Sequence, residues 1–325
     1  MRLYLTGADG MLGTALTAAL REDPSTSDWP VLGVSADDFD IADADAVHRS
    51  IDAFRPDVVV HAAANAIVDE CEANPELALR VNVTGTQNVA QACRRHRSRL
   101  VYLSSDYVFD GARTPPGGYR EADAPNPLSV YGRTKLAGER ISATVADHLI
   151  VRTSWLFGGA RERTDNLLAT IRQAQRGQRA RLVYDQYGCP TYTVDLAHAI
   201  TYLLTRDEPV TGTVHIASTG STSWHHAGAL ALAAFDPDLA RTHAPEPVAL
   251  DDCGLLAGRP RNSSLSSDRL AGIGFPMPSW YDAVHRFAAA LADAAAVDAV
   301  PVGEEPAGAA PVAAAPVPVP AGAGR

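Results

Sequence analysis

The stretch TGADGMLG, residues 6–13, decides the fold, because it joins a strand to a helix through three glycines. MRLYLTG (1–7) predicts a short apolar strand, and MLGTALTAALRE (11–22) has apolar residues at helical spacing. Glycine lets the backbone turn sharply and approach a ligand, and the following helix N-terminus offers free N–H groups to a phosphate. The loop is therefore predicted to hold the pyrophosphate of a dinucleotide. The residues expected in this contact are Gly7, Asp9, Gly10, Met11, Leu12 and Gly13.

The alternation of strand and helix continues beyond this loop. Further strands are expected at 30–35, 56–64 and 99–105, and helices at 43–54 and 75–95. Strands that alternate with helices of this length form βαβ units. We therefore expect an α/β fold with a doubly wound parallel sheet of the Rossmann type.

The pattern loosens after about residue 155. A mixed segment is predicted, with helices at 164–176, 192–205 and near 223–235, a strand at 212–217, loops at 236–262 and a last helix at about 279–294. The expected domains are an NAD(P)-binding Rossmann domain at 1–160 with a returning segment at about 185–217, a smaller substrate-binding domain at 161–184 and 218–294, and a disordered tail at 295–325. The tail is mostly Ala, Pro, Val and Gly, which cannot bury enough surface to offset its ordering entropy. A helical extension of its first few residues stays open.

Composition excludes several classes of function. The 325 residues carry a net charge of −10, and no basic face that could bind nucleic acid is visible. The four cysteines form no CxxC pair, so neither a zinc site nor a disulfide framework is expected. Neither a signal peptide nor an apolar run approaching the roughly 20 residues of a membrane helix is found, so the expected compartment is the cytoplasm.

The glycine spacing, G-x-x-G-x-x-G, resembles that of the extended short-chain dehydrogenase/reductase superfamily, which implies a tyrosine and a lysine four residues apart. The second strand ends in VLGVSADDFDI, where an acid usually accompanies a free ribose hydroxyl and an arginine a 2′-phosphate. Ser35 occupies that position and no basic residue is nearby, so NADH is weakly favoured, although NADPH remains open. Asp40 and Ile41 resemble the pair that lies beside the adenine in this superfamily. The cofactor residues expected outside the glycine loop are Ser35, Asp40, Ile41, Ala62, Ala63, Ala64, Tyr131 and Lys135.

SVYGRTKLAGER (129–140) contains the implied pair, Tyr131 and Lys135. On a helix, residues four apart share a face. An ammonium group beside a phenol favours the phenolate and would lower the pKa of Tyr131 from about 10. A tyrosine of lowered pKa suits a general acid that protonates a reduced carbonyl.

The strand RLVYLSS supplies a third group. Because side chains alternate along a strand, Val101, Leu103 and Ser105 share one side, whereas Tyr102 and Ser104 share the other. The strand ends at the edge of the sheet where open α/β sheets bind ligands. We expect the Ser105 hydroxyl to hydrogen-bond the substrate carbonyl oxygen that Tyr131 protonates.

Several consecutive motifs resemble the dTDP-4-dehydrorhamnose reductase family. They are LSSDYVFDG, SVYGRTKLAGE, VRTSWLFG (151–158), DQYGCPTYTVDLA (185–197), GSTSWHHAG (220–228) and AGRPRNSSLSSDRL (257–270). The resemblance implies reduction of the 4-keto group of a nucleotide-linked 6-deoxyhexose, with Ser105 in place of the family's catalytic threonine. The implied substrate contacts are Val68, Asp69, Ser105, Asp106, Tyr107, Trp155 and Arg259.

Some family members dimerise through magnesium held by acids near the last helix. Asp282 is the single acid in PSWYDAVHRF, so no metal site is expected, and homodimerisation stays open. Three other functions remain possible: a ketoreductase for another deoxysugar, such as a dihydrostreptose-like sugar; a non-catalytic regulatory subunit of the methionine adenosyltransferase type; and a nucleotide-sugar epimerase or dehydratase. A regulatory subunit is disfavoured, because it would not need the complete set Ser105, Tyr131 and Lys135. An epimerase or dehydratase is disfavoured, because the C-terminal motifs resemble those of reductases.

Overall fold

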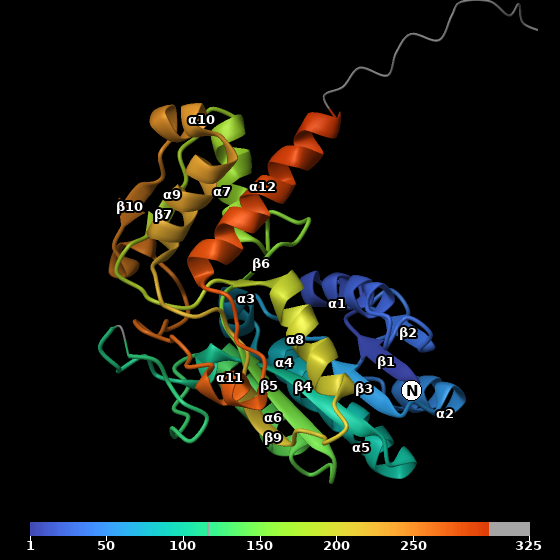
Figure 1. Cartoon of the computed structure of the whole chain (residues 1–325). Helices are drawn as coiled ribbons and strands as arrows, with labels where there is room; N and C mark the ends of the chain where they lie inside the picture. Colours follow the sequence, from blue (N-terminus) through green and yellow to red (C-terminus); the bar gives the residue numbers. More distant parts are fainter. Residues whose placement is uncertain (116, 299–325) are drawn as a thin grey trace, which may run out of the picture.

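The computed structural model describes residues 1–115 and 117–298. Its centre is a six-stranded parallel sheet in the order β2-β1-β3-β4-β5-β9 (Figure 1). In that order, the strands are β2 (Val31–Val34), β1 (Leu3–Thr6), β3 (Val58–His61), β4 (Arg99–Ser105), β5 (His148–Thr153) and β9 (Gly212–His215). The order reverses between β1 and β3, which is the topological switch point of a doubly wound sheet. The expected α/β class is confirmed.

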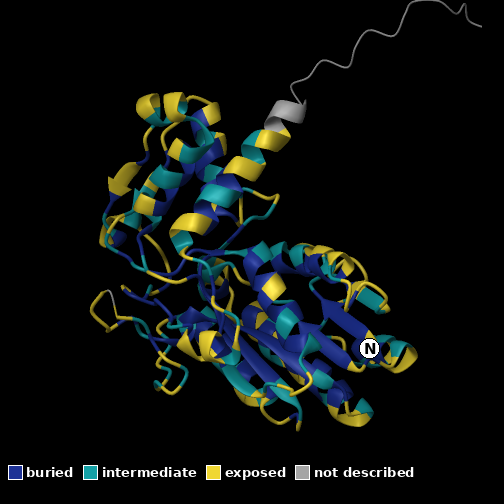
Figure 2. Ribbon diagram, viewed as in Figure 1, coloured by how far each residue is buried: buried dark blue, intermediate teal, exposed yellow. Residues whose placement is uncertain are grey.

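Helices cover both faces of this sheet, and its inner strands are buried (Figure 2). On one face, Leu3, Leu5 and Val101 belong to a core cluster that includes α1 and α8. On the other face, Tyr4 and Leu100 pack with residues of α2 and α5. These helices are α1 (Met11–Glu22), α8 (Thr193–Thr205), α2 (Ala44–Phe54) and α5 (Gly85–His96), and α6 (Val130–Ser142) packs against β4 and α5. Alternate side chains along the strands thus pack into two apolar layers, one on each face of the sheet.

Two features of the first half differ from the sequence prediction. The helix expected at 75–95 is α4 (Pro75–Leu79) followed by a π-helical turn, η1 (Arg80–Thr84), and then α5. Such turns are rare and concentrate at functional sites. The strand β5, which pairs with β4 from Leu100 to Ser105, was not predicted.

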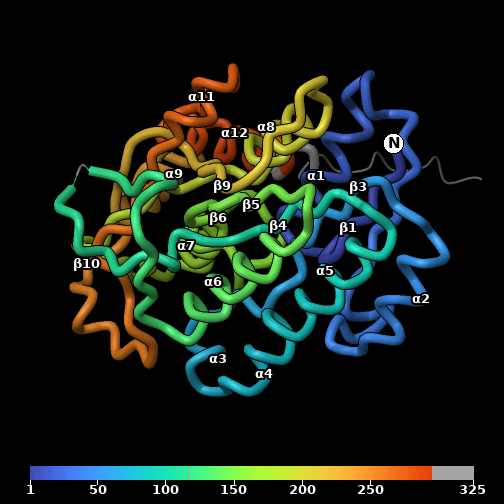
Figure 3. The backbone as a smooth tube through the Cα atoms, turned by 90° about the horizontal axis from the view of Figure 1, so that it is seen from below, coloured from blue at the N-terminus to red at the C-terminus, as the bar shows by residue number. Residues whose placement is uncertain are grey.

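A smaller lobe lies beside the carboxyl end of the sheet (Figures 1 and 3). Its core is formed by Phe157 and by apolar residues of three helices, α7 (Asn166–Gln175), α9 (Trp224–Phe235) and α12 (Trp280–Asp298). Two short parallel pairs complete it, β6 (Leu156–Phe157) with β8 (Thr191–Tyr192) and β7 (Arg181–Val183) with β10 (Glu246–Val248). The remaining short elements are α3 (Val68–Ala73), η2 (Asp106–Val108), α10 (Pro237–Thr242), η3 (Leu250–Cys253) and α11 (Asp268–Ile273).

The C-terminal third differs from two expectations. The segment expected as loops at 236–262 contains α10, β10 and η3. Leu270 and Met277, expected in the substrate-binding domain, pack in the core of the parallel sheet. The last helix continues to Asp298, which is the helical extension that the sequence left open for the first residues of the tail. The rest of the predicted tail, 299–325, lies outside the described residues. Within 1–115 and 117–298, no helix is both long and apolar enough to cross a membrane.

Candidate active site

The glycine loop has the geometry that a pyrophosphate requires. Gly7 has φ +69°, and a Cβ on it would lie 2.9 Å from the Ala63 nitrogen. A Cβ on Gly13 would lie 2.2 Å from the Gly7 carbonyl oxygen, so a larger residue would disrupt the turn. Helix α1 begins after Gly10 with no side-chain cap, which leaves its first N–H groups free for an anion. These residues fit the pyrophosphate of a dinucleotide.

A cavity of about 1760 Å³ extends from this loop to the small lobe. Asp69 is the one predicted contact residue outside its lining. Those in the lining are Gly7, Asp9, Gly10, Met11, Leu12, Gly13, Ser35, Asp40, Ile41, Ala62, Ala63, Ala64, Val68, Ser105, Asp106, Tyr107, Tyr131, Lys135, Trp155 and Arg259. The cavity is larger than the roughly 300–1,000 Å³ of a pocket for one drug-sized molecule. It therefore has room for a dinucleotide and a second nucleotide-linked ligand.

Helix α6 carries Tyr131 and Lys135 into this cavity. The Ser129 hydroxyl accepts a hydrogen bond from the Gly132 N–H at 3.1 Å and caps the helix beside Tyr131. Burial raises the pKa of Tyr131, although a hydrogen bond with Ser105 acts in the opposite direction. The lowered tyrosine pKa expected from the sequence is therefore not found. At neutral pH Tyr131 is a phenol, which is the state that a proton donor requires.

The charge of Lys135 lies against an aromatic ring. Its Nζ is 4.5 Å from the centroid of the Tyr102 ring, in a position that favours a cation. Burial lowers the pKa of Lys135 to about 8, and the nearby Glu139 carboxylate opposes this shift. Lys135 therefore remains mostly an ammonium at neutral pH, close to the point where it titrates.

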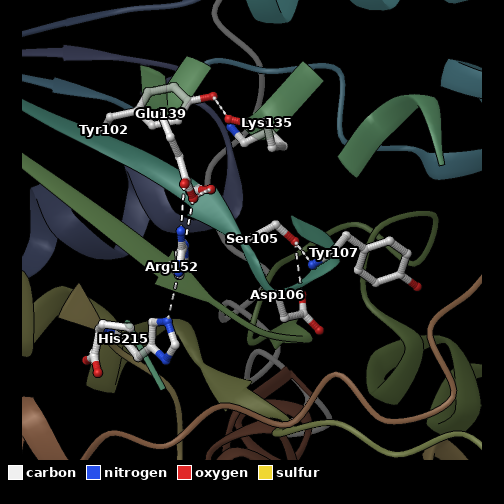
Figure 4. Close-up of polar contacts among 10 residues, drawn as sticks. Tyr102, Ser105, Asp106, Tyr107, Lys135, Glu139, Arg152 and His215 are labelled. Carbon is white, nitrogen blue, oxygen red and sulfur yellow. Dashed lines mark hydrogen bonds and ion pairs between the residues drawn. The ribbon is translucent and has the colours of Figure 1, made fainter. Parts of the chain in front are cut away.

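Ser105 is held by its own strand end (Figure 4). Its Oγ donates to Asp106 Oδ1 at 2.9 Å and accepts from the Tyr107 N–H at 3.2 Å. Ser104 points to the other side of the strand, toward α6, where its Oγ donates to Glu139. The alternation predicted for the two serines is therefore present in β4.

Asp106 is engaged by three serines from three parts of the chain. Besides Ser105, its Oδ2 accepts from Ser154 after β5 at 3.0 Å and from Ser263 at 2.5 Å. Its side chain is buried, and burial raises the pKa of Asp106 to about 6 although these hydrogen bonds lower it. Both carboxylate oxygens are already hydrogen-bonded, so Asp106 is better placed to orient Ser105 than to bind substrate.

A buried ionic network lies beside Lys135 and Ser105 (Figure 4). Glu139 on α6 accepts two hydrogen bonds of 2.8 Å from the Arg152 guanidinium on β5. Arg152 also lies 3.5 Å from His215 Nε2 on β9. Because Glu139 is one helical turn beyond Lys135, this network links the position of α6 to the centre of the sheet.

The predicted substrate residues other than Asp69 line the cavity. Trp155 is buried with φ +48°, stacks on Trp224 at 4.3 Å, and its Nε1 has no hydrogen-bond partner among the described residues. A buried donor of this kind in a cavity wall fits a polar ligand. Arg259 forms an ion pair with Asp69 at 3.1 Å, so Asp69 positions the arginine. The Arg259 guanidinium lies 5.9 Å from the Tyr107 ring centroid.

Sequence reasoning missed several basic residues in the cavity wall. They are Arg80, Arg161, Arg163, Arg172 and Arg181. Two of them form ion pairs: Arg161 pairs with Asp9 at 3.5 Å, and Arg163 pairs with Glu70. The segment ARERT (160–164), directly after a glycine pair, was the available signal for these two. The others carry no local pattern.

The described residues contain no group of three or more His, Cys, Asp or Glu that could hold a metal ion. Asp282, the acid considered for such a site, pairs with Arg286 at 2.8 Å. All four cysteines are free thiols.

A phenol, a hydroxyl and an ammonium that meet beside a dinucleotide loop define an oxidoreductase of the short-chain dehydrogenase/reductase type. Comparison with known proteins narrows this class. A family model described as the RmlD substrate binding domain matches residues 1–293. The chain belongs to this family, that of the dTDP-4-dehydrorhamnose reductases, as its motifs indicated.

Individual relatives of the chain carry names that agree with this family. The chain is 37% identical to a dTDP-4-dehydrorhamnose reductase of Mycobacterium tuberculosis over 302 residues, which cover 91% of this chain and 95% of the relative. It is 36% identical to a dTDP-4-keto-6-deoxy-D-glucose reductase of Streptomyces niveus, with 87% and 95% covered. It superimposes on a dTDP-4-dehydrorhamnose reductase of Bacillus anthracis, solved in complex with NADP, with a TM-score of 0.79 and 33% identity. That match covers 88% of this chain and 98% of the other.

Proposed function

We propose that the protein reduces the 4-keto group of a dTDP-4-keto-6-deoxyhexose with NADPH or NADH, in nucleotide-sugar biosynthesis. The observation that carries the proposal is that Ser105, Tyr131 and Lys135 line the same cavity as the glycine loop. A protein that only bound a dinucleotide would not need these three groups. The names of the relatives support the dTDP-linked sugar as substrate.

The chain's own groups supply the proton chemistry. A reduced nicotinamide, when bound in this cavity, would supply the hydride for C4 of the sugar. Tyr131, protonated at neutral pH, gives its proton to the carbonyl oxygen, so the ketone becomes an alcohol. Ser105 orients that oxygen, and its hydrogen bond stabilises the tyrosinate left behind. The ammonium of Lys135, one helical turn away, lowers the energy of that anion.

We propose that the small lobe holds the nucleotide part of the substrate. Arg172 and Arg181 line the cavity there, and guanidinium groups match the geometry of a diphosphate. Arg259 and Trp155 lie between this lobe and the catalytic groups, where the sugar would be held. This division supports the domains expected from the sequence, apart from the 268–277 segment, which packs on the parallel sheet.

The test is to mix the protein with dTDP-4-keto-6-deoxyglucose, with and without a 3,5-epimerase, and follow NADPH and NADH absorbance. Oxidation of the cofactor with formation of the 4-hydroxy sugar is expected. If neither cofactor is consumed with any 4-keto sugar, the proposal is wrong. The product's stereochemistry distinguishes dTDP-rhamnose from another deoxysugar.

We also propose the cytoplasm as the working compartment, which agrees with the free thiols of all four cysteines. Homodimerisation, which the family resemblance allows, is a further proposal that light scattering would test.

A further inference from the structure

The end of the cavity beyond the glycine loop is formed by the turn after β2 and by Arg80 and Val81 of the π-helical turn. The turn after β2 contributes Ser35, Ala36, Phe39, Asp40 and Ile41 to the lining. Arg80 is the cation of this end, and it is 45 residues away from Ser35 in the chain. The expectation that no basic residue lies near this position is therefore wrong in three dimensions.

We propose that Arg80 binds the 2′-phosphate of NADPH and makes NADPH the preferred cofactor. This inference rests on the proposed function, because it concerns the cofactor of that reaction. A guanidinium donates two parallel hydrogen bonds to a phosphate and cannot do so to a ribose hydroxyl. The contact would therefore distinguish the two cofactors at the single group in which they differ.

The acids of the turn do not form the site that a free ribose hydroxyl would use. Asp38 Oδ2 accepts the Ser35 N–H at 2.8 Å and lies 3.3 Å from the Ser35 Oγ, so it caps the turn. Neither Asp37 nor Asp38 belongs to the cavity lining. Asp40 does, but its carboxylate is paired with the Arg80 guanidinium at 2.6 Å. The position that usually carries the discriminating acid holds Ser35, a small residue that leaves room for a phosphate.

The Asp40–Arg80 pair can yield to a phosphate. The two side chains are 40% and 57% exposed, and exposed ion pairs contribute little to stability. A phosphate with close to two charges offers Arg80 a stronger partner than a carboxylate does. Before the cofactor binds, the ion pair with Asp40 keeps the Arg80 guanidinium at the cavity.

The backbone that carries Arg80 is fixed by side-chain hydrogen bonds. Asn82, two residues later in η1, is buried. Its Oδ1 accepts from the Asn65 N–H at 2.8 Å, and its Nδ2 donates to the Asn65 carbonyl at 3.0 Å and to Thr134 Oγ1 at 2.9 Å. The π-helical turn is thereby tied to α6 and to the loop after β3, so Arg80 starts from a defined position.

Binding of NADPH and NADH, measured by nicotinamide fluorescence without sugar, tests the proposal. Arg80→Gln should raise the dissociation constant of NADPH at least tenfold and change that of NADH by less than twofold. Adenosine 2′,5′-bisphosphate should likewise lose affinity, and 5′-AMP should not. Asp40→Asn should tighten NADPH, because it removes the competing carboxylate. The matched control is Arg95→Gln, which breaks a similarly exposed pair with Asp52 outside the cavity lining.

Equal weakening of both cofactors in Arg80→Gln, or no change in either, would overturn the assignment, as would a wild-type protein that binds NADH more tightly than NADPH. Because no sugar is present, these outcomes are independent of the reductase proposal. Turnover of a 4-keto sugar with unaltered cofactor preference in Arg80→Gln would leave the function intact and remove only the role of Arg80.

Discussion

At the scale of single residues, the position of the Ser105 hydroxyl is set by its hydrogen-bond partners. Its hydroxyl is shared among the Asp106 carboxylate, the Tyr107 N–H and Tyr131. The resemblance of LSSDYVFDG to the family motif implies a threonine at this place in the family. A threonine carries the same hydroxyl with one extra methyl group, so serine and threonine can make the same hydrogen bonds here.

Two substitutions of Ser105 test whether its hydroxyl group is needed for turnover. Ser105→Ala should lower kcat by about 10²–10³, the usual cost of one donor to a reacting oxygen. Ser105→Thr should stay within about tenfold of the wild type, because the hydroxyl is retained. Steady-state kinetics with saturating cofactor measures both. Activity in Ser105→Ala equal to that of the wild type would show that another group orients the carbonyl.

The residue scale also shows what the sequence could predict. Strand alternation placed Ser104 and Ser105 on the correct sides of β4, because the side-chain period of a strand is local. Helical spacing likewise placed Tyr131 and Lys135 on one face. The sign of the shift in the Tyr131 pKa was wrong, because burial depends on the whole fold. Arg80 was missed because its ion-pair partner Asp40 is distant in the chain.

At the scale of elements, α6 is coupled to β5 through the Glu139–Arg152 pair. Both side chains are almost fully buried, at 6% and 5% exposed. Removing one member of such a pair costs more than replacing both, because an uncompensated charge stays in the core. Neither partner could be assigned from the sequence, since β5 itself was not predicted.

Glu139→Gln should lower the free energy of unfolding by about 3–5 kcal/mol. The double variant Glu139→Met with Arg152→Met should be more stable than Glu139→Gln, because no unpaired charge remains. Urea unfolding of the three proteins measures this, with Arg95→Gln as the control at an exposed pair. A double variant less stable than Glu139→Gln would contradict the account.

At the scale of the whole molecule, two neutral histidines lie in the sheet. Burial lowers the pKa of His61 and of His215 to about 3. His61 Nδ1 lies 2.7 Å from the Thr6 hydroxyl and Nε2 lies 3.0 Å from the Thr86 hydroxyl, which donates to the Asn82 carbonyl. Nε2 is therefore the donor, and the neutral ring satisfies both threonines.

Stability should consequently decrease in acid. The unfolded histidines take up protons below about pH 6.5, whereas the folded ones do so only near pH 3, so each lowers the free energy of unfolding as pH falls through this window. Asp106 acts in the opposite direction between about pH 6 and 4, because burial raises its folded pKa to about 6. Asp165, whose pKa burial also raises, acts with it. The shift in the pKa of each histidine, to about 3, is larger than that of Asp106.

His61→Gln should reduce the slope of unfolding free energy against pH by up to about 1.4 kcal/mol per pH unit below pH 6.5. Urea titrations at pH 7 and pH 5 measure the slope, and the exposed His198→Gln is the control. An unchanged slope in His61→Gln would mean that the pKa of His61 is the same in the folded and unfolded protein, and would contradict the account.

The whole architecture was the most predictable level, because the glycine loop and the alternation of strands and helices are repeated signals. The short elements of the small lobe were not predicted, since β6, β7, β8 and β10 each have only two or three residues. Their stability comes from packing across the lobe rather than from local pattern.

The central claim is that Tyr131 protonates a sugar ketone in this cavity. Its most direct test compares turnover of dTDP-4-keto-6-deoxy sugar and cofactor binding in the wild type, Tyr131→Phe and Tyr107→Phe. Tyr131→Phe should lower kcat by about 10²–10⁴ and leave the dissociation constant of the cofactor within about threefold. Tyr107→Phe should retain most of the turnover. Loss of turnover in Tyr107→Phe with turnover kept in Tyr131→Phe would contradict the account.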